Sequence, residues 1–224
     1  MPESAQSAAS HAVEDYLKAI YALESRIGGP VSTNALAARL GVTTGSVSGM
    51  LRRLSELGLV AHERYRGTTL TAEGRRGALR IVRNHRLIEL LLVEMLDVPW
   101  ELVHREAEQL EHALSDELAE RIAAKLGHPR VDPHGDPIPD ADLSITEIKS
   151  RSLDDVEPGE RVSFVRVSDA DPDMLRYLSD RGIAPGAVLT VTDRQPFGGP
   201  ITVRTRNAEH HLGHQLAAAM WVTD

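Results

Sequence analysis

Residues 32–74, STNALAARLGVTTGSVSGMLRRLSELGLVAHERYRGTTLTAEG, carry the pattern that decides the fold. The Ser/Thr pairs at 32–33 and 43–44 can cap two short helices, NALAARL and GSVSGMLRRLSELG, each of which ends at a glycine. Two short strands, LVAHERYRG and TTLTAEG, follow around a charged turn. A helix pair followed by a β-hairpin predicts a winged helix-turn-helix, which is a DNA-binding module.

Basic residues concentrate in this module. Ten Lys and Arg stand against three Asp and Glu between Arg39 and Arg86, whereas residues 87–224 hold 13 basic and 26 acidic residues. Small polar residues at the start of the second helix could approach base edges, and nearby arginines would contact phosphates. The residues expected to bind DNA are Thr43, Thr44, Gly45, Ser46, Ser48, Gly49, Arg52, Arg53, Arg64 and Arg66. The alternative is an ordinary helical hairpin with Ser/Thr caps and solvated arginines.

Composition places the chain among globular proteins with more than one domain. Its 224 residues are 42% hydrophobic and 26% charged, and no apolar run approaches the roughly 18 residues of a membrane span. The first dozen residues show neither a basic nor an apolar region that would mark export, so we expect a cytoplasmic protein. The chain has no cysteine, which excludes disulfides and thiolate zinc sites. Any metal must therefore be bound by His, Asp, Glu, Met or carbonyl groups.

Three helical segments frame the expected DNA-binding module. Apolar residues recur with helical spacing over His11–Arg26, before the module. After it, one helix is expected over Ala72–Leu96 and another over Trp100–Leu126, separated at Pro99. Beyond Arg86 the first of these two is apolar nearly all round, and a second subunit is the expected means of burying it.

The C-terminal third changes to a β pattern. Residues 127–142 hold four Pro and two Gly and predict a linker. The stretches RVSFVRV, AVLTVTD, PITVRT and HHLG follow, interrupted by one helical segment, DPDMLRYLSDRG, and together they predict a small β-barrel of about 75 residues. We therefore expect an α+β multidomain protein with a winged helix-turn-helix domain over 1–75, a helical domain over 76–145 and the barrel over 146–224.

Histidines and glutamates form a stripe on the helix that begins at Trp100. Their spacing is i, i+4, i+7 and i+8, so the four share one arc of a regular helix: His104, Glu108, Glu111 and His112. A second i, i+4 pair, His85 and Glu89, lies on the preceding helix. The alternative is that these are ordinary solvated residues. Spacing alone leaves a metal site and a solvated helix flank about equally supported.

Several motifs resemble the diphtheria-toxin-repressor family, which includes iron- and manganese-dependent transport regulators. They are EDYLKAIYAL (14–23), SVSGMLRRLSELGLV (46–60), LTAEGR (70–75), NHRLIELLL (84–92), VHREAEQLEHALSDEL (103–118) and PHGDPIP (133–139). The resemblance implies a winged-helix domain, a helical dimerisation and metal-binding domain, and a C-terminal SH3-like (FeoA-like) domain. These match the three segments described above.

The resemblance also implies two metal sites. The activating site of the family corresponds to Asp15, Glu108, Glu111 and His112. The ancillary site corresponds to His85, Glu89 and His104, completed by the SH3-like domain through Asp171 or, less strongly, Met174. In short manganese regulators with a two-metal site a Glu stands where this chain has Lys18, so that binuclear arrangement is not transferred.

Two positions indicate which metal is sensed. Iron-sensing members of the family have Met and Cys where this chain has Asp15 and Glu108, whereas manganese sensors have Asp and Glu. A site of three carboxylates and one imidazole is hard and oxygen-rich, and sites select Mn²⁺ through such ligands, geometry and availability rather than raw affinity. The expected cofactor is Mn²⁺, with Fe²⁺ as the alternative and Co²⁺ or Zn²⁺ as substitutes in vitro.

We therefore expect a manganese-dependent repressor of metal-uptake genes, active when Mn²⁺ bridges the DNA-binding and dimerisation domains. Its expected partners are double-stranded operator DNA and a second copy of the chain, with no membrane and no small organic substrate. The alternatives are an Fe²⁺-dependent repressor, a sensor of an organic ligand on the same fold, and a metallohydrolase. The metallohydrolase is disfavoured because the sequence has no HExxH motif, no nucleophile elbow and no phosphate loop. The other histidines are interpreted as surface residues: His62, His134, His210, His211 and His214.

Overall fold

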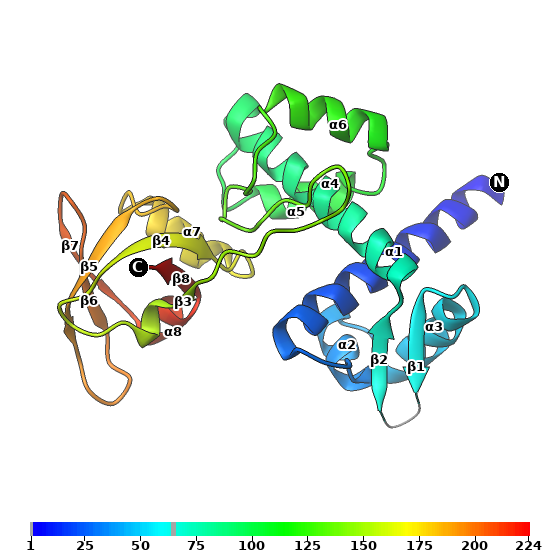
Figure 1. Ribbon diagram of the computed structural model, residues 1–224, viewed down its shortest axis with the longest axis horizontal. Coiled ribbons are helices and arrows are strands. Elements are labelled where there is room, and N and C mark those ends of the chain that lie inside the picture. The colour runs from blue at the N-terminus through cyan, green and yellow to red at the C-terminus, as the bar shows by residue number, and fades with distance from the viewer. Residues whose placement is uncertain (1, 64–65) are drawn as a thin grey trace. The chain divides into compact units, whose positions relative to one another are not determined.

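The computed structural model describes residues 2–63 and 66–224 and divides into two compact units. The first unit comprises Met1–His85, Glu111–Ser115 and Pro139–Ser144, and the second comprises the rest of the chain. Figure 1 shows both units with their elements labelled. Within the described residues, no helix is both long enough and apolar enough to cross a membrane.

The first unit contains the predicted helix pair and wing. Helices α2 (Thr33–Leu40) and α3 (Thr44–Glu56) are followed by an antiparallel hairpin of β1 (Val60–Glu63) and β2 (Gly67–Leu70). The expected caps form: the Ser32 hydroxyl accepts the Ala35 N–H at 3.1 Å, and the Thr43 hydroxyl accepts the Ser46 N–H at 3.2 Å. Gly41 ends α2 in the left-handed conformation at φ 66°, which a glycine adopts without strain.

Helix α1 (Pro2–Ile27) lies against this module and begins nine residues before the predicted start at His11. Its apolar face and α2, α3, β1 and the start of α4 enclose one core, in which Ile20, Leu36 and Leu51 are fully buried. Glu24 ties α1 to the wing, because its two carboxylate oxygens accept the Leu70 N–H at 2.8 Å and an Arg75 N–H at 2.9 Å.

Helix α4 (Ala72–Leu96) has the bounds predicted from sequence and passes from the first unit into the second at His85. The single helix expected over residues 100–126 is wrong. The structure has α5 (Val103–Leu110), a turn at 111–115 and α6 (Asp116–Lys125). The buried Asn84 amide donates to the carbonyl oxygens of Glu111 and Leu114 at 3.1 and 3.2 Å, so these carbonyls have partners outside a helix.

The C-terminal part of the second unit is a six-stranded antiparallel sheet in the order β3-β8-β4-β5-β6-β7. Its strands are β3 (Arg151–Ser152), β4 (Arg161–Val167), β5 (Val188–Arg194), β6 (Ile201–Arg204), β7 (Glu209–Leu212) and β8 (Met220–Thr223). Helices α7 (Pro172–Ser179) and α8 (His214–Ala218) and a 3-10 turn, η1 (Leu153–Asp155), complete this part. One apolar core, with Phe164 fully buried, holds it together. Strands β3 and β8, η1 and α8 were not predicted from sequence.

Candidate functional site

Three potential metal ligands meet in the first unit, and we call Asp15, Glu111 and His112 the first cluster. Each offers one ligand atom, and these atoms lie within 4.8 Å of one another. The His112 Nε2 atom lies 3.0 Å from Asp15 Oδ1 and 3.7 Å from Glu111 Oε1. Asp15 comes from α1, whose following residues Tyr16 and Leu17 are buried, while Glu111 and His112 come from the turn after α5. Two carboxylates and an imidazole can bind a divalent cation here.

Lys18 neutralises the buried carboxylate of this cluster. Its Nζ atom donates to Glu111 Oε1 at 2.9 Å and to Oε2 at 2.7 Å, and it lies 3.0 Å from His85 Nδ1. The His85 ring also contacts Glu111 Oε2 directly. Burial by itself would raise the pKa of Glu111, but the hydrogen bond with His85 and the charge of Lys18 outweigh it and hold that pKa below its usual value. Glu111 is therefore an anion at neutral pH, with Lys18 as its cationic partner in the metal-free protein.

Glu14 orients the His112 ring, and sequence reasoning missed it. The Glu14 Oε2 atom lies 2.7 Å from His112 Nδ1, and the His11 ring stacks on the same imidazole with centroids 4.6 Å apart. Metal-binding histidines commonly donate their second ring N–H to a carboxylate in this way, which leaves the other nitrogen available as a ligand. The available signal was the adjacent acidic pair Glu14-Asp15 on a helix that was already expected to supply a ligand.

Glu108, the fourth ligand expected from sequence, lies near the end of α5 in the second unit, whereas the three residues of the first cluster belong to the first unit. Its side chain is 57% exposed, and its Oε1 atom lies 3.5 Å from Nε2 of His104, one turn earlier on α5. Because α5 ends at Leu110, the helical spacing that would have placed Glu108 on one face with Glu111 and His112 does not apply. The first cluster as described has three ligand groups.

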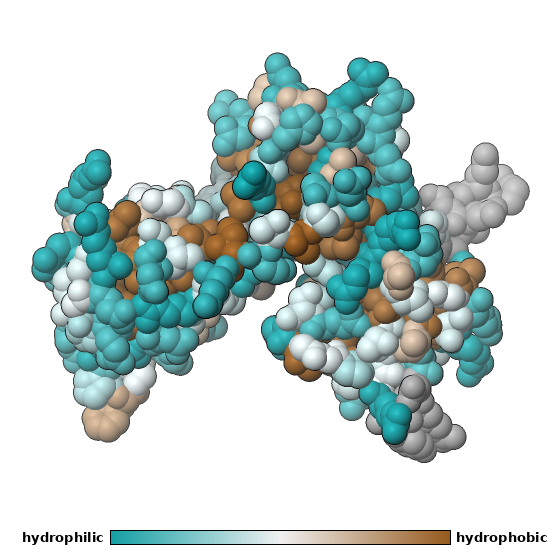
Figure 2. All heavy atoms as spheres, in the orientation of Figure 1, coloured by the Kyte–Doolittle hydropathy of each residue, from teal (hydrophilic) through white to brown (hydrophobic). Residues whose placement is uncertain are grey.

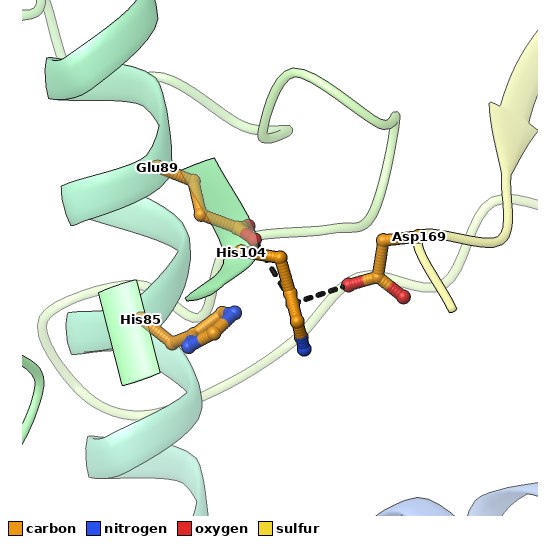
Figure 3. Close-up of side chains that lie close together, drawn as sticks. All are labelled: His85, Glu89, His104 and Asp169. Atoms are coloured by element: carbon orange, nitrogen blue, oxygen red, sulfur yellow. Dashed lines mark hydrogen bonds and ion pairs between the residues drawn. The ribbon is translucent and has the colours of Figure 1, made fainter. Parts of the chain in front are cut away.

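A second cluster of ligand groups lies in the second unit and consists of Glu89, His104 and Asp169. The His104 Nδ1 atom is 2.8 Å from Asp169 Oδ2 and 3.3 Å from Glu89 Oε1 (Figure 3). Glu89 is buried on α4, His104 lies on α5, and Asp169 lies in the loop after β4. His85 is one helical turn before Glu89 on α4, as Figure 3 shows.

Mutual charge interactions fix the protonation of this cluster. Burial would lower the pKa of His104, but hydrogen bonds with Asp169 and Glu89 raise it to about 10. Burial would raise the pKa of Asp169, but its hydrogen bond with His104 lowers it to about 2. At neutral pH the metal-free second cluster therefore holds a protonated imidazole between two carboxylates.

Metal affinity of the second cluster is expected to rise with pH. His104 must lose its proton to bind a cation, and its pKa is about 10 in the metal-free protein. At every pH below that value the cation displaces one proton, so affinity should increase by up to about tenfold per pH unit. The measurement is calorimetric titration with Zn²⁺ at pH 6, 7 and 8, comparing the wild type with His104→Gln. If the difference between the two proteins does not change with pH, the expectation is wrong.

Asp171 and Met174 do not take the ligand positions proposed from sequence. Asp171 caps α7, with its side chain accepting the N–H groups of Asp173 and Met174, and Met174 packs against the core of the sheet. Asp169, two residues earlier, supplies the carboxylate instead. The sequence carried the signal, since an Asp immediately before a Pro at a helix start is a typical N-cap. Asp169 is the acidic residue of the loop that pairs with His104 instead of capping the helix.

Most of the expected DNA-binding residues lie at the start and on the outer face of α3, and Arg66 lies in the wing just before β2. The exposed members of the set are Thr43, Thr44, Gly45, Ser46, Ser48, Gly49, Arg52, Arg53 and Arg66. Some hydroxyls also have local roles, because Thr43 caps the helix and Ser48 donates to the Thr44 carbonyl at 2.8 Å. A side chain added at Gly49 would meet nothing within 4 Å, so the surface is open there. Arg64 lies outside the described residues.

His134 is not a surface residue, which corrects the sequence interpretation. Its side chain is fully buried, with ring nitrogen Nε2 2.9 Å from the carbonyl oxygen of Trp100 and the two rings stacked at 5.6 Å. The reason is that the linker is ordered: a β-bridge between Val131 and Pro137 closes a tight loop that turns His134 inward.

Family models match nearly the whole chain. The N-terminal DNA-binding domain of iron-dependent repressors matches residues 9–68, their metal-binding and dimerisation domain matches 71–140, and the FeoA domain matches 151–224. The chain belongs to the diphtheria-toxin-repressor family. It is a metal-dependent transcriptional repressor and not an enzyme, which excludes the metallohydrolase alternative.

Relatives within the family are described with different metals. The iron-dependent repressor IdeR of Mycobacterium leprae is 33% identical over 93% of this chain and 95% of its own length. A manganese-dependent transcriptional repressor solved in complex with manganese is 44% identical, with a TM-score of 0.86 over 95% of this chain and 99% of its own. The structure of ScaR with bound Cd²⁺ is 29% identical, with a TM-score of 0.79 over 95% and 99% of the two chains.

Proposed function

We propose that this repressor is activated by Mn²⁺ and, as a homodimer, represses metal-uptake genes by binding their operators. The observation that carries the proposal is the donor set of the first cluster, in which two carboxylates and one imidazole converge. The chain has no cysteine that could add a thiolate. Hard ligands such as these carboxylates suit Mn²⁺, whereas soft sulfur ligands favour other metals. The manganese-dependent structural relative supports this choice, and the iron-dependent relatives keep Fe²⁺ as the second candidate.

One ion is assigned to the first cluster. The Lys18 ammonium already donates to both oxygens of Glu111, so that side of the carboxylate carries a tethered positive charge. A second divalent cation on this side would face strong repulsion from an ammonium group. The ligands proposed for the single ion are Asp15, Glu111 and His112, with Glu14 holding the imidazole in place.

The coupling of metal to DNA follows from where Asp15 lies. It is on α1, which packs directly against the helix-turn-helix core, while Glu111 and His112 lie on the turn at 111–115. A bound divalent cation supplies the positive charge that holds these carboxylates together. Tyr16 and Leu17 of α1 lie in the same hydrophobic core as α3, so a cation that fixes the position of α1 would also fix the position of α3. By reciprocity, DNA should tighten metal binding by the same factor.

The proposed DNA-binding domain covers residues 1–75, with the metal-binding and dimerisation domain over 76–145 and the SH3-like domain over 146–224. Support for dimerisation comes from apolar residues that remain exposed on the helices of the second unit. The large apolar side chains exposed on these helices are Met95, Leu96, Leu110 and Leu118. Figure 2 shows hydrophobic residues, in brown, reaching the surface over this part of the molecule. A two-fold dimer would place two recognition helices for two half-sites.

Arg53→Ala is expected to weaken operator binding without changing which sequence is preferred. Arg53 is exposed on α3, where a phosphate contact adds affinity regardless of sequence. The loss should lower the slope of log affinity against log salt by about one unit. Fluorescence anisotropy between about 50 and 200 mM salt measures this. The control is Arg121→Ala, which removes an exposed arginine of α6. An equal change of slope in both variants would show that α3 is not part of the DNA interface.

Chelation tests the proposed function directly. The probe is a DNA duplex selected from a random pool by the Mn²⁺-loaded full-length protein. Treatment with EDTA should abolish binding to this duplex, and added Mn²⁺ should restore it. If chelated protein keeps full affinity, an organic effector becomes the better account. If Fe²⁺ alone restores binding under anaerobic conditions, the iron-dependent candidate replaces the manganese one.

A further inference from the structure

Asn84 of α4 contacts the turn that carries two ligands of the first cluster. The residue is buried, with 2% of its surface exposed. Its side-chain Nδ2 donates to the Glu111 carbonyl oxygen at 3.1 Å and to the Leu114 carbonyl oxygen at 3.2 Å. An asparagine amide has two N–H groups, one for each of these carbonyls. The side chain therefore joins the two ends of the segment 111–114.

The two carbonyl groups lie where the chain leaves one helix and approaches the next. Helix α5 ends at Leu110, so the Glu111 carbonyl lies just beyond it, and Leu114 precedes α6, which begins at Asp116. Carbonyl groups at the end of an α-helix have no intrahelical partner and need donors from elsewhere. The Asn84 amide supplies hydrogen bonds to both carbonyls, which stabilises the non-helical turn.

This turn allows two adjacent residues, Glu111 and His112, to converge. Neighbouring residues of a regular α-helix point about 100° apart and do not face each other. In the structure His112 Nε2 lies 3.7 Å from Glu111 Oε1, and the ligand atoms of both residues lie within 4.8 Å of that of Asp15. The departure from helical geometry thus brings the two side chains to one place.

Helix α4 contacts both the backbone and the side chain of Glu111. Asn84 donates to the Glu111 carbonyl, and the next residue, His85, contacts the carboxylate oxygen Oε2. Glu111 is 1% exposed, and side chains in a close-packed interior have little room to adjust. A shift of the Glu111 backbone would therefore move the carboxylate with it.

We propose that Asn84 is a positioning residue of the activating metal site, whose amide sets the turn so that Glu111 and His112 converge on one divalent cation. This inference rests on the proposed function, because it concerns the same cluster. Asn84 does not bind the cation itself and acts through the backbone of the ligands. Removing a partner that orients metal ligands typically lowers metal affinity about 10- to 100-fold, and we expect a loss of about tenfold or more.

The test is the affinity of the first cluster for Mn²⁺, measured in full-length protein by competition with a fluorescent chelator and without DNA. The reference protein carries His104→Gln, which removes an imidazole of the second cluster so that the titration reports the first. In this background Asn84→Leu keeps a side chain of similar size without N–H donors, and its Mn²⁺ dissociation constant should rise about tenfold or more. Asn84→Gln keeps both N–H groups and should recover most of the affinity.

A stability control separates positioning from general destabilisation. In the same background Val31→Ala truncates a fully buried side chain in the core that α1, α2 and α3 share. It should leave the Mn²⁺ dissociation constant at the reference value. Circular dichroism establishes that every protein compared is folded. If Asn84→Leu does not fold, Asn84→Ala, which also lacks the donors, takes its place.

The outcomes distinguish this proposal from the proposed function. A reference-level dissociation constant in Asn84→Leu would overturn the positioning role. Equal losses in Asn84→Leu and Asn84→Gln, or in Asn84→Leu and Val31→Ala, would also overturn it. In each of these cases the reference protein binds Mn²⁺, so the proposed function stands. If the reference protein binds no Mn²⁺, the proposed function fails and the positioning role fails with it.

Discussion

Asp15→Ala protein is expected to bind operator DNA with about the affinity of the metal-free wild type, even at saturating Mn²⁺. Asp15 is the ligand of the first cluster that α1 contributes, so its removal separates metal binding from the DNA-binding module. Coupling between sites typically changes affinity about 5- to 150-fold, and we expect a loss near the upper end of that range. Fluorescence anisotropy with the selected duplex gives the number.

The matched control for Asp15→Ala is Asp142→Ala. Asp142 is an exposed aspartate outside both clusters, so this variant should respond to Mn²⁺ as the wild type does. Circular dichroism establishes that both variants keep their helices. Wild-type affinity in folded Asp15→Ala protein at saturating Mn²⁺ would show that the first cluster does not control DNA binding.

Lys18→Met is expected to destabilise the metal-free protein and to make its stability strongly dependent on Mn²⁺. The substitution leaves Glu111 without its ammonium partner, and the Glu111 side chain is only 2% exposed. Breaking a fully buried pair costs about 3–5 kcal/mol; because Lys18 is 19% exposed, we expect about 2–3 kcal/mol. Urea denaturation with EDTA measures the loss, and Mn²⁺ should recover more stability than in the wild type.

The pH dependence of Lys18→Met follows from the lowered pKa of Glu111. A carboxyl with a lowered folded pKa contributes stability above its unfolded pKa and loses it as pH falls through the folded value. Without Lys18 the folded pKa rises, so this acid-side loss should begin at higher pH than in the wild type. Lys149→Met, which removes an exposed lysine, is the control. Identical acid profiles for the two variants would contradict the assigned role of Lys18.

The local signals in the sequence identify the DNA-binding module because they are short-range. Caps at Ser32 and Thr43 and a left-handed glycine at 41 act within one helical turn, so they survive in the fold unchanged. The bounds of α4 are predicted equally well, since its apolar pattern runs without a break to Leu96. The family resemblance supplied Asp15, which spacing alone could not connect to a histidine almost a hundred residues away.

Tertiary contacts explain the failures. The Asn84 amide donates to the carbonyl oxygens of Glu111 and Leu114, which are 27 and 30 residues away in the sequence. No local pattern shows that these hydrogen bonds divide the predicted helix. The single stripe that joined His104 and Glu108 to Glu111 and His112 assumed that continuous helix. Asp171 was expected to be a ligand because the capping role of an Asp before Pro was not weighed. His134 looked exposed because a Pro- and Gly-rich segment predicts a linker, whereas this one is closed by a β-bridge.

The central claim is that a divalent cation, Mn²⁺, switches on operator binding. The most direct test is an anaerobic titration of wild-type protein and the selected duplex with buffered Mn²⁺ or Fe²⁺, which gives the free metal concentration at half-maximal DNA binding. We predict full activation by Mn²⁺, with the oxygen-rich first cluster needing no sulfur ligand. DNA binding that is unchanged by Mn²⁺ across the titration would contradict the account.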